Sequence, residues 1–203
     1  MINLRRRLNV PALGPAPPRR GNRFTAWIAM MCFWMTGWRF EGTVPNLPKF
    51  IIIAAPHTSN WDFVLTVGAL FAIGIHVSFM VKHTLFWWPM GAYLRWSGGL
   101  PIDRRAPRGA VEEAVAAFRS RDKLVLGITP EGTRARVERW KTGFYHIAVA
   151  AAVPLLPLAF DYEHKMIRLG LPLMPTGNKE VEMAELRSFY AGIKGKYPQN
   201  FQP

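Results

Sequence analysis

Phe-Ile-Ile-Ile-Ala-Ala-Pro-His-Thr-Ser-Asn-Trp-Asp, residues 50–62, is the segment that most clearly indicates the class of fold. Its first part, residues 50–54, is continuously apolar, which is typical of a strand buried on both faces of an α/β sheet. Ser59 then has the character of a helix N-cap, and Asp62 follows three residues later, close to a capping-box arrangement. The stretch therefore predicts a buried strand, a short loop and a helix. In α/β folds the carboxyl end of such a strand opens onto a ligand crevice.

His57 and Asp62 lie in this loop and helix start, with four residues between them. A carboxylate held in the first helical turn can turn back toward an imidazole, hold one ring nitrogen and leave the other free as a general base. The alternative is that Asp62 only complements the helix dipole and that His57 is an ordinary loop residue. The pair by itself does not decide between these two interpretations.

Two further strand-like segments also end in polar residues. One runs into Pro-Glu-Gly-Thr-Arg at residues 130–134, and the other, residues 98–105, ends in paired arginines. Gly132 permits a tight turn with close backbone approach, while Thr133 and Arg134 offer a hydroxyl and a guanidinium suited to phosphate oxygens. A solvated surface turn is the alternative for residues 130–134 taken alone. Three polar strand ends together predict a site at one edge of a sheet.

The hydrophobic pattern after residue 41 alternates between strand and helix periods. Besides the segments above, it predicts helices at 61–73, 108–120, 140–152 and 180–194, and strands at 76–81, 123–129 and 155–159. There is no internal repeat and no sign of a second domain. The expected architecture is a single α/β domain over residues 41–203, with a mixed, largely parallel sheet flanked by helices.

Residues 1–40 differ from the rest of the chain. Arginines cluster there before any acidic residue, and four prolines between residues 11 and 18 favour an extended, mobile arm. Residues 24–38 then carry no charge. A helix of that length measures about 22 Å, short of a hydrocarbon core of about 30 Å. The favoured interpretation is a membrane-associating helix that dips into one leaflet, and a helix buried on the core is the alternative.

Three side chains of this helix, Trp27, Trp34 and Trp38, resemble interfacial anchors. Its cysteine, Cys32, is the chain's only one and has no basic neighbour to lower its pKa, so it is interpreted as a packing residue. Residues 85–96 are the most aromatic stretch of the chain. Core packing is the commoner fate of such residues, and lining an acyl tunnel or resting on a membrane are the alternatives.

Composition narrows the classes of partner. The formal net charge is +13, half of the residues are hydrophobic and eight are Trp. A basic, aromatic-rich surface suits anionic headgroups, an acidic carrier protein, coenzyme A phosphates or nucleic acid. No nucleic-acid-binding motif is present, so nucleic acid is not expected. The histidines have no metal-ligand spacing, so no metal site is expected. A Walker loop and a Gly-x-Ser-x-Gly elbow are also missing, which argues against NTP hydrolysis and a serine hydrolase.

Four blocks of the sequence resemble, in order, those of the glycerolipid acyltransferases. They are His57-x4-Asp62, the Gly-x-x-x-Ile-Asp-Arg run that ends at Arg104, residues 130–134 and residues 153–158. The resemblance implies transfer of a fatty acyl chain from an acyl-CoA or acyl-carrier-protein thioester to the hydroxyl of a lysophospholipid, with 1-acyl-glycerol-3-phosphate giving phosphatidic acid. It implies no cofactor beyond that thioester co-substrate.

The same resemblance suggests a role for each matching residue. His57 is implied as the base and Asp62 as the residue that orients it. The acceptor phosphate is implied to lie against Arg104, Glu131, Gly132, Thr133 and Arg134. Departures from the commonest pattern at Pro56, Thr129 and Ala135 leave room for another acceptor, such as a lyso-ornithine lipid or a glycolipid. A non-catalytic membrane lipid-binding protein is the alternative from a different class.

Partners and location follow from these expectations. Membrane lipids and an acyl-CoA or an acyl carrier protein are the expected partners. The expected location is the cytoplasmic face of the inner (plasma) membrane, reached through the basic arm and interfacial helix of residues 1–40. The sequence does not indicate an oligomeric state.

Overall fold

The computed structural model describes residues 2–102 and 107–201. Its helices are α1 (Ile2–Arg7), α2 (Arg23–Thr36), α3 (Asn60–Ile73), α4 (Met90–Ser97), α5 (Pro107–Ser120), α6 (Gly143–Ala151) and α7 (Lys179–Ser188), with the 3-10 helices η1 (His83–Leu85) and η2 (Pro198–Asn200). Its strands are β1 (Arg39–Glu41), β2 (Lys49–Ala55), β3 (Ser78–Lys82), β4 (Gly99–Ile102), β5 (Leu124–Ile128), β6 (Leu155–Asp161) and β7 (Met166–Leu169).

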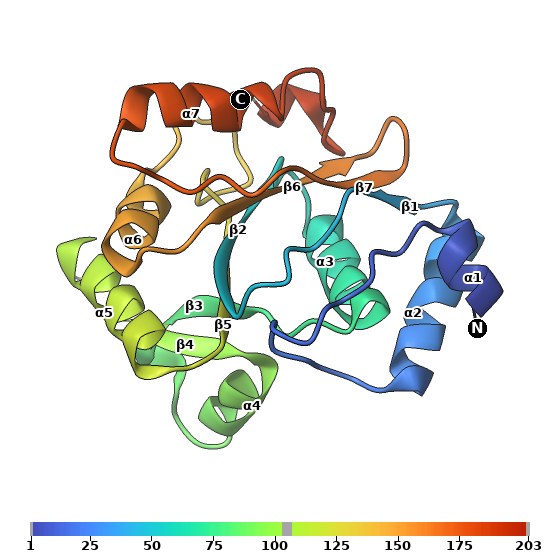
Figure 1. The fold of residues 1–203 in the computed structure, drawn as a ribbon, viewed down its shortest axis with the longest axis horizontal. Coiled ribbons are helices and arrows are strands. Elements are labelled where there is room, and N and C mark those ends of the chain that lie inside the picture. Colours follow the sequence, from blue (N-terminus) through green and yellow to red (C-terminus); the bar gives the residue numbers. More distant parts are fainter. Residues whose placement is uncertain (1, 103–106, 202–203) are drawn as a thin grey trace.

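Over these two ranges the strands form one seven-stranded sheet in the order β1-β7-β6-β2-β5-β3-β4 (Figure 1). β6 and β7 pair antiparallel as a hairpin, and the other neighbours pair in parallel. The described residues therefore form a single α/β domain with a mixed, largely parallel sheet, as predicted. β1 and β7 were not predicted, because strands of three and four residues are too short for a clear hydrophobic period.

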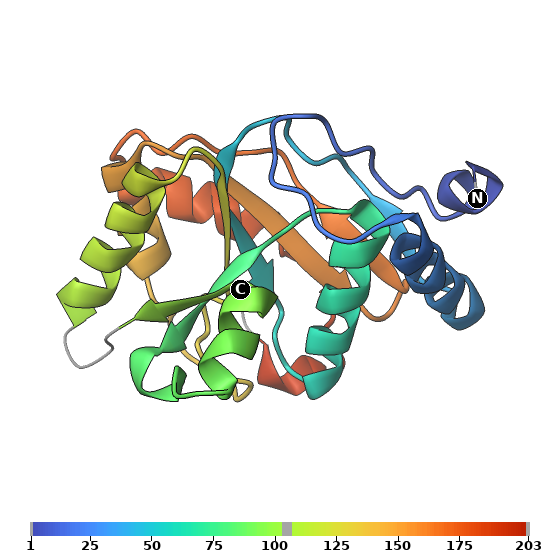
Figure 2. The same cartoon turned by 90° about the horizontal axis from the view of Figure 1, so that it is seen from below.

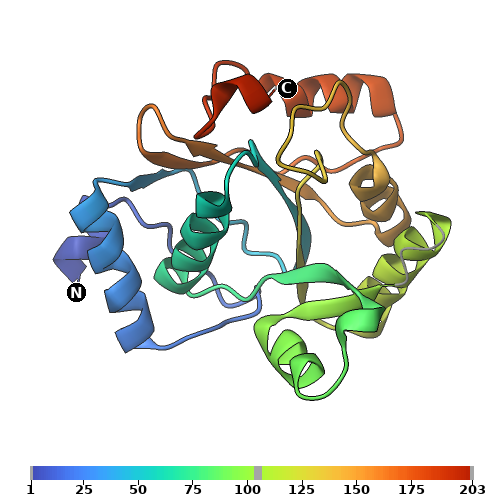
Figure 3. The same cartoon turned by 180° about the vertical axis from the view of Figure 1, so that it is seen from behind.

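Two hydrophobic layers cover the sheet, one on each face. In β2, Phe50 and Ile52 belong to the layer that contains α2 and α3 (Figure 3), whereas Ile51, Ile53 and Ala55 belong to the layer with α5, α6 and α7. Successive side chains of a strand point to opposite faces, so an unbroken apolar run can fill both layers. This explains why the central strand has no polar face in the sequence.

Local signals fix the start and end of α3. The Ser59 hydroxyl accepts a hydrogen bond from the N–H of Trp61 at 3.1 Å, and the Asp62 carboxylate accepts one from the N–H of Ser59 at 2.8 Å. These contacts form the predicted capping box, and such a cap stabilises a helix by about 1 kcal/mol. At the other end Gly74 adopts φ +87°, a left-handed conformation that favours glycine and ends the helix. The predicted bounds of β2 and α3 are confirmed to within one residue.

The amino-terminal segment is not extended throughout, because it starts with a helix and packs on the rest of the domain. Residues Ile2–Arg7 form α1, and the side chains of Leu8 and Val10 are buried in the layer that holds α2. The Phe40 N–H donates to the carbonyl of Leu8 at 2.8 Å, which ties this segment to β1. The proline and arginine content of the segment gave no signal that its few apolar residues pack on the core.

Helix α2 is apolar on all sides, but the fold buries only one of its faces. Its inner face, which includes Met30 and Phe33, packs on the core beside α3. Its outer face exposes large apolar side chains: Phe24, Trp27, Ile28, Trp34 and Met35. The buried-helix alternative is therefore correct for one face, and the structure does not test membrane contact by the other. No helix in the described part of the chain has both the length and the apolar character needed to cross a bilayer.

The interpretations of Trp38, just after α2, and of Cys32, within α2, are wrong. Trp38 is buried and packs edge-on against Tyr162, so it is not an interfacial anchor. Cys32 is exposed rather than packed in the core. Both errors have one cause: hydropathy identifies an apolar segment, but only the packing of the helix decides which of its side chains face inward.

Two other segments also differ from expectation. Residues 85–96, expected to pack in the core, become η1 and α4 at the edge of the sheet, and their largest side chains are exposed: Leu85, Trp87, Trp88, Met90, Tyr93 and Trp96. The carboxyl-terminal helix, predicted at 180–194, ends at Ser188, and Tyr190 turns into the core. Because α4 packs against β4, the strand at the edge of the sheet, the sheet contacts only one side of this helix.

Candidate active site

The carboxyl ends of β2, β5 and β6 lie side by side, because β2 pairs in parallel with both of the other strands. His57 follows β2, Glu131 follows β5 and Tyr162 follows β6 directly. Figure 2 shows the edge of the sheet where these strands end, with the amino end of α3 and helix α4 on the same side of the molecule. Parallel pairing thus brings together three side chains that are far apart in the sequence, at the place where α/β folds bind ligands.

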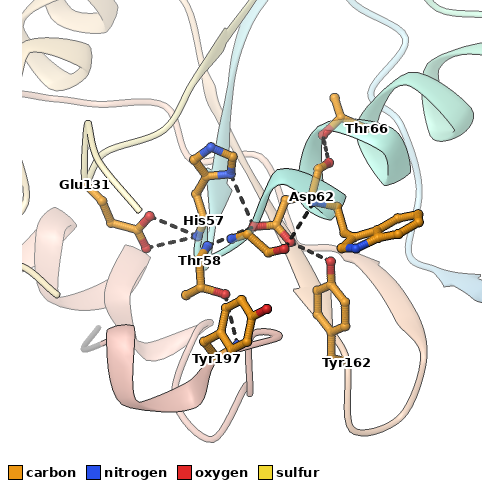
Figure 4. Close-up of polar contacts among 9 residues, drawn as sticks. His57, Thr58, Asp62, Thr66, Glu131, Tyr162 and Tyr197 are labelled. Carbon is orange, nitrogen blue, oxygen red and sulfur yellow. Dashed lines mark hydrogen bonds and ion pairs between the residues drawn. The ribbon is translucent and has the colours of Figure 1, made fainter. Parts of the chain in front are cut away.

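His57 and Asp62 face each other across the loop (Figure 4). The Nδ1 atom of His57 lies 3.3 Å from the Oδ2 atom of Asp62. The imidazole is 18% exposed and the carboxylate 1%, so solvent reaches the histidine but not its partner. The other ring nitrogen points away from Asp62 (Figure 4). One nitrogen is held and the other is free, which is the geometry a general base requires.

The Asp62 carboxylate is surrounded by donors. Its Oδ2 accepts hydrogen bonds from the N–H groups of Thr58 and Ser59, both at 2.8 Å, and its Oδ1 accepts one from the Tyr162 hydroxyl at 2.6 Å. Burial by itself raises the pKa of Asp62, but hydrogen bonds from the His57 and Tyr162 side chains and from the backbone outweigh it. The pKa therefore lies below its ordinary value, and the buried group is a stable anion.

Glu131 lies on the other side of His57. Both of its carboxylate oxygens accept a hydrogen bond from the backbone N–H of His57, at 3.2 and 2.9 Å. Burial raises the pKa of Glu131 to about 7, although this N–H opposes the change. A buried carboxylate bound to the backbone is better suited to hold the His57 loop than to contact an anionic phosphate. The role implied for Glu131 by resemblance concerned the acceptor, and the contacts favour a different one.

The turn after β5 carries the exposed polar groups of the site. Gly132 adopts φ +67°, and a Cβ atom there would lie 2.9 Å from the ammonium nitrogen of Lys141. The left-handed backbone conformation favours glycine here, and the Lys141 side chain lies against the turn. Thr133 and Arg134 are exposed beside it. Lys141 was not identified from the sequence, since a single lysine nine residues beyond Gly132 gives no local signal of its own.

Arg104, the remaining predicted acceptor residue, lies outside the described residues. The strand that leads to it, β4, ends at Ile102 and pairs in parallel with β3. In the ranges that the structure describes, no three His, Cys, Asp or Glu side chains are grouped as metal ligands. The described site thus offers an imidazole, a buried carboxylate partner and cations beside a glycine turn.

Tyr162 is the other residue that the sequence analysis missed. It lies in the turn between β6 and β7, one hundred residues from its partner Asp62. The predicted strand ended at residue 159, three residues before Tyr162, so the sequence showed only that Tyr162 lies beyond a strand. The pairing of that strand with β2 was not visible in the sequence, because register depends on tertiary contacts.

A family model described as Acyltransferase matches residues 39–161, which is more than half of the chain. The chain belongs to the acyltransferase family. The matched region begins at β1 and ends at β6, so it contains His57, Asp62 and Glu131 but stops one residue before Tyr162. The resemblance of the four sequence blocks to this family is thereby confirmed.

Curated relatives carry a more specific name. The chain is 33% identical over 126 residues to the 1-acyl-sn-glycerol-3-phosphate acyltransferase of Escherichia coli, an alignment that covers 59% of this chain and 50% of the relative. It is 28% identical over 162 residues to the enzyme of the same name from Limnanthes douglasii, covering 75% of this chain and 56% of that one. The chain thus spans about half the length of these curated relatives.

A solved structure has the same fold. The 1-acyl-sn-glycerophosphate (LPA) acyltransferase of Thermotoga maritima superimposes with a TM-score of 0.59 over 84% of this chain and 78% of the other, at 19% sequence identity. At that identity the likeness establishes the fold alone. It supports the assignment of the sheet and its flanking helices to the architecture of this family.

Proposed function

We propose that the protein transfers a fatty acyl chain from an acyl-CoA or acyl-carrier-protein thioester to the hydroxyl of a lysophospholipid, with 1-acyl-glycerol-3-phosphate as acceptor and phosphatidic acid as product. The observation that carries the proposal is the His57 imidazole held by a buried, ionised Asp62 at the carboxyl edge of the sheet in an acyltransferase-family domain. The names of the curated relatives support this choice of acceptor.

The chemistry requires one base and no enzyme nucleophile, because a thioester is already activated. The free ring nitrogen of His57 takes the proton of the acceptor hydroxyl as its oxygen attacks the thioester carbonyl carbon. The carbon–sulfur bond of the tetrahedral intermediate then breaks, and the leaving thiolate takes the proton back from the imidazolium. Asp62 stabilises that imidazolium, and its lowered pKa keeps it from taking the proton itself.

The turn after β5 is the proposed acceptor-phosphate site. The Arg134 guanidinium, the Lys141 ammonium and the Thr133 hydroxyl are exposed there, and the cations match a phosphate dianion. Arg104 is proposed to complete the set from the end of β4. Glu131 is proposed to hold the His57 loop at a fixed distance from this turn, since its carboxylate binds the His57 backbone.

A lipid surface is the proposed setting of the reaction. The outer face of α2 exposes Trp27 and Trp34, and η1 with α4 exposes Trp87 and Trp88. Exposed tryptophans suit the interface between headgroups and acyl chains, and the net charge of +13 suits an anionic leaflet. We therefore propose attachment to the cytoplasmic face of the inner membrane, where acyl thioesters and lysophospholipids meet. No cofactor besides the thioester is required by this chemistry.

The test is thiol release by the purified protein. Acyl-CoA and acyl-carrier-protein donors are each combined with 1-acyl-glycerol-3-phosphate or with monoacylglycerol, which lacks the phosphate. We expect release of free thiol only with the phosphorylated acceptor. His57→Ala should lower kcat by about 100-fold or more, since general-base catalysis contributes about 10²–10⁴-fold. The control His146→Ala, an exposed histidine of α6, should retain wild-type turnover.

The outcomes separate the parts of the proposal. Wild-type turnover by folded His57→Ala protein would show that His57 is not the base. Equal turnover of monoacylglycerol and 1-acyl-glycerol-3-phosphate would overturn the phosphate site. Absence of turnover with every donor and acceptor would contradict the acyltransferase assignment for this chain.

A further inference from the structure

The Tyr162 hydroxyl makes the shortest hydrogen bond to the Asp62 carboxylate among the described residues. Its oxygen donates to Asp62 Oδ1 at 2.6 Å, compared with 2.8 Å for each of the two backbone donors to Oδ2. The two carboxylate oxygens therefore have separate tasks. Oδ2 faces His57 and the loop backbone, while Oδ1 contacts the Tyr162 side chain from the turn after β6 (Figure 4).

Holding both oxygens fixes the plane of the carboxylate. The donors to Oδ2 come from Thr58 and Ser59, so they are set by the same loop that carries His57. A carboxylate held through one oxygen alone can still turn about its Cβ–Cγ bond. A second bond at Oδ1, from a residue outside the loop, removes that freedom and keeps Oδ2 directed at the imidazole.

Tyr162 is itself held from two sides. Its ring packs edge-on against Trp38, with the centroids 5.0 Å apart at 90°, and its backbone N–H donates to the carbonyl of Lys194 at 2.9 Å. The first contact comes from the segment between α2 and β1, and the second from the carboxyl-terminal segment. Burial, together with the hydrogen bond to Asp62, raises the pKa of Tyr162 far above its ordinary value. The phenol therefore stays protonated and remains a donor.

We propose that Tyr162 is a positioning residue for the acyl-transfer reaction, which acts through Asp62 to set the orientation and proton affinity of His57. The kinetic test of this inference rests on the proposed function, whereas the contacts among Tyr162, Asp62 and His57 do not depend on it. It extends the His–Asp pair to a Tyr–Asp–His chain. The added residue, Tyr162, lies outside the sequence region that the family model matches.

The direction of the effect follows from electrostatics. A neutral donor on Oδ1 draws negative charge from the carboxylate and weakens its attraction for the imidazolium. Without the Tyr162 hydroxyl, Asp62 becomes more basic and favours protonated His57 more strongly. A larger fraction of the histidine is then charged near neutral pH and cannot accept a proton. Activity falls, and the acid limb of the pH–rate profile moves to higher pH.

The test is the variant Tyr162→Phe, which removes one oxygen and keeps the ring on Trp38. We expect kcat to fall about tenfold, as for loss of a hydrogen bond to a charged group, with both KM values within about twofold of wild type. The acid limb of kcat should move to higher pH. Tyr145→Phe is the matched control, since the Tyr145 hydroxyl donates to the Glu182 carboxylate at 2.7 Å in a buried pair elsewhere. It should lose stability without a change in the pH profile.

A second measurement tests the same idea without turnover. The His57 ring is titrated by NMR in wild type, in Tyr162→Phe and in protein with 3-fluorotyrosine at position 162. The fluorinated phenol is a stronger donor of similar shape, so its effect on the His57 titration should be opposite in sign to that of Tyr162→Phe. An Asp62→Asn background supplies the coupling test, because Tyr162→Phe should change kcat much less there.

Two results would overturn the inference. One is a wild-type pH profile and His57 titration in folded Tyr162→Phe protein. The other is an equal fractional loss of kcat on Tyr162→Phe in the wild-type and Asp62→Asn backgrounds, which would mean that Tyr162 does not act through Asp62. Failure of the proposed function is a different result, namely no thiol release by wild type, and the NMR titration still tests Tyr162 in that case.

Discussion

Asp62 and Glu131 are two buried carboxylates on either side of His57 whose pKa values move in opposite directions. At Asp62 the effect of the hydrogen-bond donors exceeds the effect of burial, so the pKa is lowered. At Glu131 the effect of burial is the larger one and raises the pKa to about 7. Asp62 therefore favours its anionic form, whereas Glu131 loses its proton less readily than an exposed carboxylate. Carboxylates with divergent pKa values are typical of sites that move protons.

A stability measurement tests the raised pKa of Glu131. The folded protein binds this proton more tightly than the unfolded chain, whose ordinary pKa is 4.5. Its stabilising contribution is therefore full below pH 4.5 and is lost as the pH rises through about 7. Glu131→Gln removes the ionisation, so relative to wild type its free energy of unfolding should rise between pH 5 and pH 8, by about 3 kcal/mol at most.

Urea unfolding at several pH values measures this difference. Glu138→Gln, an exposed residue of the same loop, is the control and should follow the wild-type curve. A Glu131→Gln curve parallel to wild type over this range would contradict the raised pKa.

At the residue scale, the sequence predicted the His57–Asp62 contact because a local capping box produces it. The contacts of Glu131 and Tyr162 were beyond sequence reasoning for the opposite reason. Their partners lie 74 and 100 residues away, and no local pattern encodes the strand pairing that joins them. The role of each residue in catalysis stays a prediction until the variants are measured.

At the scale of elements, α2 illustrates what hydropathy can and cannot predict. The sequence correctly predicts an apolar helix, expected over residues 24–38 and observed at Arg23–Thr36. The Asn22 side chain caps its start by accepting hydrogen bonds from the N–H groups of Phe24 and Thr25. It does not predict which side chains face outward, because the helix is apolar all round. Contact with α3 decides this and leaves Trp27 and Trp34 exposed.

The outer face of α2 is expected to bind lipid. The double variant Trp27→Ser/Trp34→Ser should weaken binding to anionic vesicles by about tenfold or more, since each large apolar side chain gains about 1.5–3 kcal/mol when fully buried. Vesicle sedimentation measures the affinity. The control Val181→Ser removes an exposed apolar residue of α7 and should bind like wild type. Equal affinity of the double variant and wild type would exclude α2 as a lipid contact.

At the scale of the whole molecule, the net charge of +13 predicts a salt-dependent membrane affinity. Each basic residue near an anionic leaflet contributes about 1 kcal/mol, and screening shortens the range to about 3 Å at 1 M salt. Binding to anionic vesicles should therefore fall steeply as salt is raised from about 0.05 M to about 0.5 M. Binding to zwitterionic vesicles, which depends on apolar contact alone, should change little. A flat salt response on anionic vesicles would contradict an electrostatic contribution.

Sequence patterns were enough to predict the class of fold, the central strand with its following helix, the His57–Asp62 pair and the family. Each of these depends on short-range patterns: an apolar run, a capping box and ordered motifs. Other features depend on how distant segments pack: Tyr162 and Glu131 contact that pair, and Lys141 lies against the Gly132 turn. Packing likewise turns Trp38 inward and Trp34 outward. The physical reason is that strand register and helix packing are settled by burial across the whole domain, and no single segment contains that information.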